Sequence, residues 1–354
     1  MRIVIKIGTN VLIDSSYHLV ESRFAHIAKD VSVLVKEGHE VILITSGAVA
    51  AGREAVPELA NTSHRKVLAS IGQLSLMQLY KENFKNFGLA VGQCLISRYD
   101  IINRESYENL VVMIESFFTT KVIPVINEND VSLNFGGNDS LAAMIAIAVK
   151  ADQLIFLTHQ KGLLTSDPTR DHTAELIPVV TRVDKEIERL CSKGVSVSGT
   201  GGMIRKIKAV QQAVFAGITS YIADGRESGA ILKIIKGENF GTRFIACAVK
   251  DLTDQKRWLM AAKGFGQVII DQGASLALRK GKSLLFPGVV AIKGLFEPNS
   301  IVEVACDGEI ISYGKINFGE KDMQQALRLK EKKLNTDELI NKEVMHRNYM
   351  IMLK

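Results

Sequence analysis

The sequence lacks the features of membrane-spanning and disulfide-rich proteins. No apolar run approaches the roughly 20 residues that cross a bilayer, and runs such as Val41–Ile44 are short enough to be buried strands. Only four cysteines occur in 354 residues, and none forms a Cys-x-x-Cys pair. We therefore expect reduced, buried thiols in a cytoplasmic protein, and neither disulfides nor a metal centre. The first residues enter an apolar strand at once, so we expect no signal peptide.

The chain also has little net charge and few aromatic residues. A net charge of +6 is compatible with an anionic substrate and does not demand nucleic acid. Aromatic residues make up 6% of the chain, with a single Trp, yet 47% of all residues are hydrophobic and 23% are charged. This balance is typical of a globular protein with a sizeable core, and the length predicts two or three domains.

Two textures divide the chain. Up to about Lys250, apolar runs alternate with helical patterns. Strands are predicted at 3–7, 40–45, 90–95, 122–126, 153–157 and 219–222, and helices at 21–37, 66–87, 104–119, 141–150 and 206–216. This alternation predicts an α/β fold with a mainly parallel sheet sandwiched by helices. From about Gly264, short strand-like runs between Gly, Pro and Asp turns predict a small β-rich domain. We place the limits at 1–250, a connector at 251–262 and the second domain at 263–354.

A glycine-rich segment, Ser198–Lys206, is the strongest single signal in the chain. Three glycines and a threonine lead straight into a predicted helix. Backbone N–H groups of such a turn can approach an anion, and the helix N-terminus adds partial positive charge. Lys206, one turn into the helix, suggests that the anion is a phosphate. The segment has neither the Walker A nor the dinucleotide-binding spacing, and a flexible loop is the alternative interpretation.

Further polar turns follow the predicted strands, where ligands bind in α/β sheets. Lys6 lies in an apolar strand just before Gly8. If the strand is central, the buried lysine requires an anion as its partner. If it is an edge strand, the lysine can reach solvent and requires no anion. The small residues of Thr45–Gly52 would let a carboxylate or phosphate approach backbone amides and the Ser46 hydroxyl. Tight helix packing would explain the same run without a ligand.

Three more turns are candidates for ligand contact. Asn127–Asp130 suits an ammonium group or hydroxyls, although Asn and Asp are also ordinary turn formers. Phe135–Ser140 opens the next predicted helix, where Asp139 either orients lysines or simply caps the helix. Thr158–Leu163 would frame a nucleotide base or ribose, and a surface position would explain His159 equally well.

In their order along the chain, these segments resemble the motifs of the amino acid kinase family, within it the glutamate 5-kinases with a C-terminal PUA domain. The matching segments are Ile5–Thr9, Thr45–Gly52, Ile126–Asp130, Gly136–Asp139, Gln160–Leu163 and Gly199–Met203 for the kinase, and 271–274, 282–289 and 294–296 for the PUA domain. The resemblance covers nearly the whole chain. It implies ATP-dependent phosphorylation of the side-chain carboxylate of L-glutamate to L-glutamyl 5-phosphate, the first step of proline biosynthesis.

The resemblance also implies a role for individual residues. The catalytic group would be Lys6 and Lys206, which clamp the transferring phosphoryl group, and Asp139, which orients both lysines. The glutamate site would comprise Ser46, Gly47, Asp130 and Asn138. The ATP site would comprise Lys6, Gly8, Thr158, His159, Thr200, Gly201, Gly202, Met203 and Lys206, with Gly8 and the glycine-rich turn donating N–H groups to phosphates. Mg²⁺ would bind together with ATP, and the resemblance assigns it no protein ligand. Feedback inhibition by proline and a homo-oligomer are further implications.

Four positions depart from the family's usual pattern. His159 replaces an Asp, Gly137 replaces an Asp, Arg205 replaces a Thr, and Phe286 replaces a Pro. None of them removes a lysine or the aspartate of the expected catalytic group, so activity is still expected.

Two other functions stay open. One is a kinase of aspartate, carbamate or another small carboxylate, and the other is a catalytically weak RNA-binding or regulatory protein. From Ala261 onward, 14 Lys and Arg stand against 11 Asp and Glu, a weaker basic excess than is typical of RNA-binding surfaces. We therefore expect a structural or regulatory second domain rather than RNA binding, and no membrane partner.

Overall fold

The computed structural model describes the chain except for residues 60–63, 133–135, 168–170, 193–201, 248–251, 263, 265, 333–341 and 354. The chain divides into two compact units. The first comprises Met1–Asp100 with Glu105–Val249, and the second comprises Ile101–Arg104 with Lys250–Lys354. In the described part of the chain, no helix combines the length and the apolar character that crossing a membrane requires.

The first unit is built on a sheet of eight described strands in the order β3-β4-β2-β1-β5-β7-β8-β6. The strands are β1 (Arg2–Ile7), β2 (Glu40–Ile44), β3 (Ala90–Ile96), β4 (Val122–Glu128), β5 (Gln153–Thr158), β6 (Val179–Val180), β7 (Thr219–Asp224) and β8 (Thr242–Phe244). Neighbouring strands are parallel except for β7 with β8. The predicted mainly parallel sheet is therefore confirmed.

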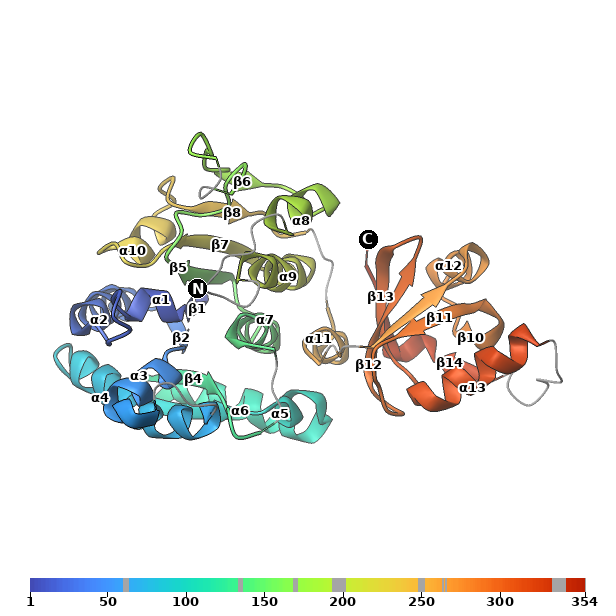
Figure 1. The fold of residues 1–354 in the computed structure, drawn as a ribbon, viewed down its shortest axis with the longest axis horizontal. Helices are drawn as coiled ribbons and strands as arrows, with labels where there is room; N and C mark the ends of the chain where they lie inside the picture. The colour runs from blue at the N-terminus through green and yellow to red at the C-terminus, as the bar shows by residue number, and fades with distance from the viewer. Residues whose placement is uncertain are drawn as a thin grey trace. The chain divides into compact units, whose positions relative to one another are not determined.

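Helices cover both faces of this sheet (Figure 1). One face carries α2 (Glu21–Lys36), α4 (Arg65–Lys85) and α10 (Ala230–Ile235), and the other carries α7 (Asn138–Ala148) and α9 (Gly202–Phe215). The other described helices before residue 250 are α1 (Thr9–Leu12), α3 (Ala48–Ala55), η1 (Pro57–Leu59), α5 (Arg98–Ile102), α6 (Arg104–Thr120) and α8 (Lys185–Ser192).

The alternation of side chains along β1 decides which residue reaches the site. Ile3, Ile5 and Ile7 belong to the apolar core on the side of α2 and α4. Because successive side chains of a strand point to opposite faces, Lys6 lies on the opposite side, toward α7. The lysine of this buried strand is therefore directed away from the larger apolar core.

Two glycines bring α3 and α4 into backbone contact. A Cβ at Gly52 would overlap the carbonyl group of Leu68, and a Cβ at Gly72 would overlap that of Ala48. Side chains larger than hydrogen are excluded at both positions, so the turn before α3 is held firmly against α4. Close helix packing thus accounts for part of the small-residue run after β2, in addition to any ligand contact.

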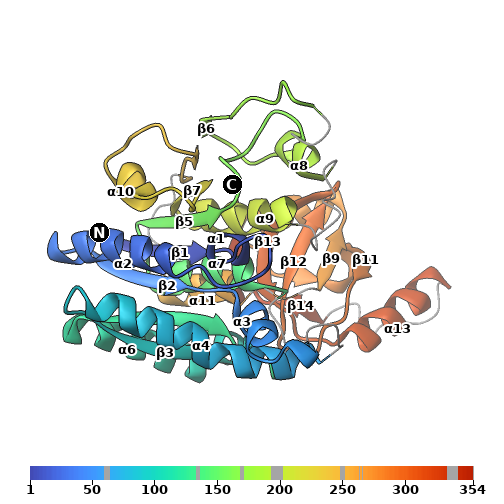
Figure 2. The ribbon, with the colours of Figure 1, turned by 60° about the vertical axis from the view of Figure 1, so that its left-hand side comes forward.

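The second unit contains a five-stranded sheet in the order β11-β9-β12-β13-β15 and a separate pair, β10 with β14. Its elements are α11 (Asp254–Ala261), β9 (Gln267–Ile270), α12 (Gln272–Arg279), β10 (Leu284–Leu285), η2 (Phe286–Gly288), β11 (Val289–Lys293), β12 (Ile301–Cys306), β13 (Glu309–Lys315), α13 (Glu320–Glu331), β14 (Glu343–Met345), η3 (Arg347–Tyr349) and β15 (Met350–Met352). Strands β9, β12 and β13 lie side by side in Figure 2. The expected β-rich domain is confirmed, and α11, from the predicted connector, packs against β13 and β15.

All four cysteines are free thiols. Cys94, Cys191 and Cys306 are buried, as expected, and burial raises the pKa of the Cys94 thiol to about 11. Cys247 is exposed instead, because it follows the last strand of the first unit, β8, where the chain leaves the sheet. The expectation of four buried thiols is therefore wrong at this one position.

Candidate active site

The polar turns gather at one edge of the first unit's sheet, because parallel strands end at the same edge. Strand β1 lies between two pairs of neighbours, with β2 and β4 on one side and β5 and β7 on the other. The turns after β2 and β4 hold the expected glutamate-binding residues, and the turn after β5 holds expected nucleotide-binding residues. Lys6, near the end of β1, thus stands between the two groups.

The three expected catalytic residues meet at this edge. The Nζ atom of Lys6 lies 2.8 Å from Oδ1 of Asp139, and the Nζ atom of Lys206 lies 3.4 Å from Oδ2. Asp139 comes from the first turn of α7 and Lys206 from the second turn of α9. Their side chains are only 7%, 14% and 12% exposed for Lys6, Asp139 and Lys206. One carboxylate therefore holds two ammonium groups in a largely enclosed place.

Burial and charge oppose each other in this cluster. Burial raises the pKa of Asp139, but the ammonium groups of Lys6 and Lys206 outweigh it and hold the pKa below its ordinary value. Burial also lowers the pKa of Lys206, against the effect of Asp139 and with that of Lys6 and Arg205. Two cations and one anion leave net positive charge in a low-dielectric place, where it would attract an anion strongly.

Asn138, the first residue of α7, joins the turns after β2 and β4. Its Nδ2 donates to Thr45 O at 2.8 Å, to Ser46 Oγ at 3.1 Å and to Asn127 Oδ1 at 2.8 Å. Its Oδ1 accepts from the Glu128 N–H at 3.2 Å. Ser46 and Asn138, both expected to bind glutamate, are therefore in direct contact.

Behind this contact, Asn127 and Thr45 meet two buried polar residues, Gln73 and Tyr80, that the sequence did not single out. Asn127 Nδ2 donates to Gln73 Oε1 at 2.9 Å, and the hydroxyls of Thr45 and Tyr80 are 2.8 Å apart. Gln73 and Tyr80 come from α4. Since buried polar groups require partners, this network fixes the turns in place. A polar side chain on the sheet-facing side of a helix is the only sequence signal for it.

The other two expected glutamate-binding residues lie in the same turns. Gly47 precedes α3 with a φ of +107°, a left-handed conformation that favours glycine. Asp130 follows β4 and is half-buried. Burial raises the pKa of Asp130, while the charges of Arg65 and Lys66 oppose the rise. Its carboxylate thus faces a partly desolvated place in which an ammonium group would be bound strongly.

On the other side of β1, Thr158 and His159 stand at the end of β5. Thr158 is buried, and His159 Nδ1 lies 3.3 Å from Asn10 Nδ2. The carbonyl of His159 accepts from Arg226 Nη2 at 2.9 Å. Burial lowers the pKa of His159, and the charges of Arg226 and Lys206 lower it further. Both effects favour the neutral form of the imidazole, against the opposing charge of Asp224.

Arg226 is a candidate that sequence reasoning missed. Its Nη2 donates to Asp224 Oδ2 at 2.6 Å and its Nε to Oδ1 at 3.0 Å. Asp224, the last residue of β7, holds Arg226, and Arg226 in turn donates to the backbone carbonyl of His159. The ion pair thereby fixes the turn after β5. The sequence signal was weak, because the strand was predicted to end at Ile222, two residues before Asp224.

The glycine-rich turns are described in part. Gly202 begins α9 and Met203 follows in its first turn, which agrees with a helix opened by glycines. Thr200 and Gly201 lie outside the described residues. The Gly8 N–H donates to Leu157 O at 2.9 Å. This N–H is engaged in pairing with β5, so it is not directed to a phosphate as expected.

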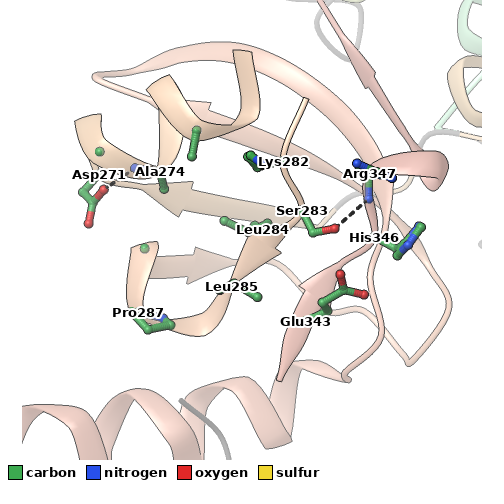
Figure 3. Close-up of a pocket in the computed structure, with 13 residues that line it drawn as sticks. Asp271, Ala274, Lys282, Ser283, Leu284, Leu285, Pro287, Glu343, His346 and Arg347 are labelled. Atoms are coloured by element: carbon green, nitrogen blue, oxygen red, sulfur yellow. Dashed lines mark hydrogen bonds between the residues drawn. The ribbon is translucent and has the colours of Figure 1, made fainter. Parts of the chain in front are cut away.

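The second unit holds an open cavity of about 780 Å³ beside α12, β10 and β14 (Figure 3). Its lining includes two basic residues, Lys282 and Arg347, and two acidic residues, Asp271 and Glu343. These four charges balance, so the cavity does not present the one-signed basic surface to which a polyanion binds.

The chain is similar to known proteins in sequence and in fold. Residues 1–224 match the amino acid kinase family, and residues 266–336 match the PUA domain. A protein of Shewanella halifaxensis named glutamate 5-kinase is 36% identical over 366 residues, which cover 99% of this chain and 98% of the relative. A protein of the same name from Dehalococcoides mccartyi is 36% identical over 369 residues, with the same coverage of both chains. A solved carbamate kinase from Giardia lamblia, 16% identical, covers 70% of this chain and 98% of its own with a TM-score of 0.51, which shows a shared fold.

Proposed function

This chain belongs to the amino acid kinase family, and within it to the glutamate 5-kinases, which it matches along nearly its whole length. We propose that it transfers the γ-phosphoryl group of ATP to the side-chain carboxylate of L-glutamate. The product, L-glutamyl 5-phosphate, is an acyl phosphate and the starting point of proline biosynthesis. The observation that carries the proposal is the ion-paired cluster of Lys6, Asp139 and Lys206 between two sets of polar turns.

The chemistry requires positioning and positive charge rather than a base. A carboxylate is already a nucleophile, but it must approach the phosphates of ATP. Two unit charges about 4 Å apart repel by roughly 4 kcal/mol at an effective dielectric constant near 20. Lys6 and Lys206 would offset this repulsion and stabilise the equatorial oxygens of the transferring group, with Asp139 keeping both ammonium groups in place.

Each substrate would have its own set of residues. For glutamate we propose Ser46 and Gly47 near a carboxylate, Asp130 at the ammonium group, and Asn138 holding the pocket together. For ATP we propose Lys6, Gly8, Thr158, His159, Thr200, Gly201, Gly202, Met203 and Lys206. Within this set Gly8 would allow close approach of the phosphates, since its own N–H is used by the sheet.

Mg²⁺ is the proposed cofactor, carried with ATP. Both carboxylate oxygens of Asp139 face lysines, so this residue is committed to the ammonium groups. Phosphate oxygens and water would supply the octahedral oxygen ligands that Mg²⁺ prefers. Bound there, the cation would neutralise phosphate charge.

The direct test is an acceptor panel. The protein, ATP and Mg²⁺ would be incubated with glutamate, aspartate, N-acetylglutamate or no acceptor, and hydroxylamine would trap any acyl phosphate as a hydroxamate. Glutamate should give the fastest hydroxamate formation. Faster hydroxamate formation with another carboxylate would show that this compound, and not glutamate, is the preferred acceptor. Release of ADP without hydroxamate formation with any acceptor would contradict the proposal.

Asp130→Ala should raise the KM for glutamate at least tenfold and that for ATP less than twofold, because a half-buried carboxylate is proposed to bind the ammonium group of one substrate alone. Burial raises the pKa of Asp130, so its ionised form is lost at a higher pH than for an ordinary Asp. The wild-type KM for glutamate should therefore rise as the pH falls through that raised pKa.

Steady-state kinetics with each substrate varied in turn measures both effects. Glu82→Ala, which removes an exposed carboxylate from α4, is the matched control and should leave both KM values unchanged. An equal rise in the two KM values for Asp130→Ala would refute the assignment of Asp130 to glutamate.

The domain limits 1–250, 251–262 and 263–354 are also part of the proposal. A chain ending at Val249 should retain glutamate-dependent hydroxamate formation, because the described site residues and their apolar core lie in the first unit. Cutting before α11 is preferable to cutting after it, since α11 packs against β13 and β15. Circular dichroism melting would establish that the fragment is folded. A folded but inactive fragment would mean that the second unit completes the site.

Three further properties belong to this proposal. Proline, which like glutamate carries a carboxylate beside an ammonium group, would compete at Ser46 and Asp130 as a feedback inhibitor. The protein would work as a homo-oligomer in the cytoplasm, where its free thiols stay reduced. The second unit would have a structural or regulatory role, which the balanced charges of its cavity favour over RNA binding.

A further inference from the structure

We propose that Arg205 is a positioning residue of the phosphoryl-transfer site, which holds the turn before α7 so that Asp139 stays within reach of Lys206. The inference rests on the proposed kinase function and adds a residue that the catalytic cluster itself does not contain.

The contact that carries the proposal joins the beginnings of two helices. Arg205 Nη1 donates to Gly136 O at 3.0 Å. Arg205 directly precedes Lys206 on α9, and Gly136 lies three residues before Asp139, which is in the first turn of α7. Helices α7 and α9 also pack against each other. One guanidinium therefore connects the segment that carries the lysine with the segment that carries its carboxylate partner.

A glycine in a left-handed conformation lies beside this contact. Gly137 has a φ of +117°, in the left-handed region that favours glycine. A Cβ at this position would lie 3.5 Å from Arg205 Nη1, in van der Waals contact. Arg205 thus closes one side of the turn, and the hydrogen bonds of Asn138 to Thr45 O and Ser46 Oγ hold the other side.

Arg205 acts on Lys206 in a second way, through its charge. Among the residues that the structure describes, the charged and titratable groups that act on the Lys206 ammonium are Asp139, Lys6, Arg205 and His159. Asp139 raises the pKa of Lys206, whereas burial, Lys6 and Arg205 lower it. Arg205 therefore has two effects, one on the position of the turn and one on the pKa of Lys206, and substitutions can distinguish them.

Two substitutions separate them. Arg205→Met removes both the hydrogen bond and the charge. It should lower kcat about tenfold, since a small misplacement of catalytic groups has a large effect on rate, with little change in the KM for ATP. The alkaline limb of its kcat profile should move to higher pH, because Lys206 loses a cationic neighbour. Arg205→Lys keeps the charge and one donor, so the limb should stay in place and kcat should recover in part. Lys208→Met, on an exposed position of the same helix, is the control and should leave kcat and the limb unchanged.

A second measurement does not depend on turnover. The N–H groups of Ser140 and Leu141 donate to Gly137 O, at 3.1 and 3.5 Å. Hydrogen exchange at these two amides, without substrates, should be faster in Arg205→Met than in the wild type and in Lys208→Met. Unchanged exchange, or a kcat of Arg205→Met within twofold of the wild type, would overturn the positioning role. A wild type that traps no glutamyl phosphate would overturn the proposed function, while the exchange measurement would still decide on Arg205.

Discussion

Lys206→Ala should lower kcat by about 10²–10³, the effect of losing one transition-state donor, with a much smaller change in the KM for ATP. The ammonium group is held 3.4 Å from Asp139 Oδ2, and the Lys206 side chain is 12% exposed. Its interaction with the transferring phosphoryl group should be strongest when charge spreads over the equatorial oxygens. Initial rates of hydroxamate formation at saturating ATP and glutamate would measure the loss.

The control is Lys208→Ala, which removes an exposed lysine from the same helix. The wild-type kcat should also fall at alkaline pH as Lys206 loses its proton. Because the pKa of Lys206 is lowered, this fall should begin at a lower pH than for an ordinary lysine. Near-normal turnover of Lys206→Ala would rule out the clamp role.

Asp139→Asn should lower kcat by at least about 100-fold, although Asn has nearly the same shape. The carboxylate is the anion that faces both Lys6 and Lys206, at 2.8 and 3.4 Å. Without its charge, the two ammonium groups repel each other and lose their fixed orientation, so the clamp is misplaced. The pKa of Lys206 should fall further, which moves the alkaline limb of the kcat profile to lower pH.

A pH profile of kcat, with protein folding followed by thermal melting, measures both effects. Removing one member of a buried charge cluster is destabilising, so the profile must be taken where the variant is folded. Asp152→Asn, at an exposed aspartate before β5, is the matched control. A folded Asp139→Asn enzyme with wild-type kcat and an unmoved limb would show that Asp139 does not orient the lysines.

Most of the fold was predictable because the central strands have a simple pattern. β1, β2 and β5 are buried on both faces, so they are almost continuously apolar in the sequence. β6 and β10 have two residues each, too few to show any periodicity. The antiparallel pairing of β8 with β7 depends on where the chain returns to the sheet, and no local pattern records that.

The site shows the same division between local and distant information. Lys6 could be predicted because a lysine in a buried strand requires an anion. Asn127 meets Gln73 54 residues away, and Arg226 meets His159 67 residues away. Their partners are set by the packing of helices and strands, which the sequence alone did not determine. The N–H of Gly8 was assigned to a phosphate because the sequence does not show that this N–H donates to Leu157 O of β5.

The adjacency of Asn138 and Asp139 has a consequence for how the two substrates bind. Asn138 contacts the Ser46 turn, where glutamate is proposed to bind, and Asp139 contacts the two lysines, where the phosphates are proposed to bind. A single turn of backbone therefore belongs to both binding equilibria. If the binding of one ligand orders that turn, the second ligand binds to a turn that is already ordered and loses less free energy in ordering it. Thermodynamic linkage requires that glutamate change the affinity for ATP by the same factor as ATP changes the affinity for glutamate, so we expect the first turn of α7 to couple the binding of the two substrates.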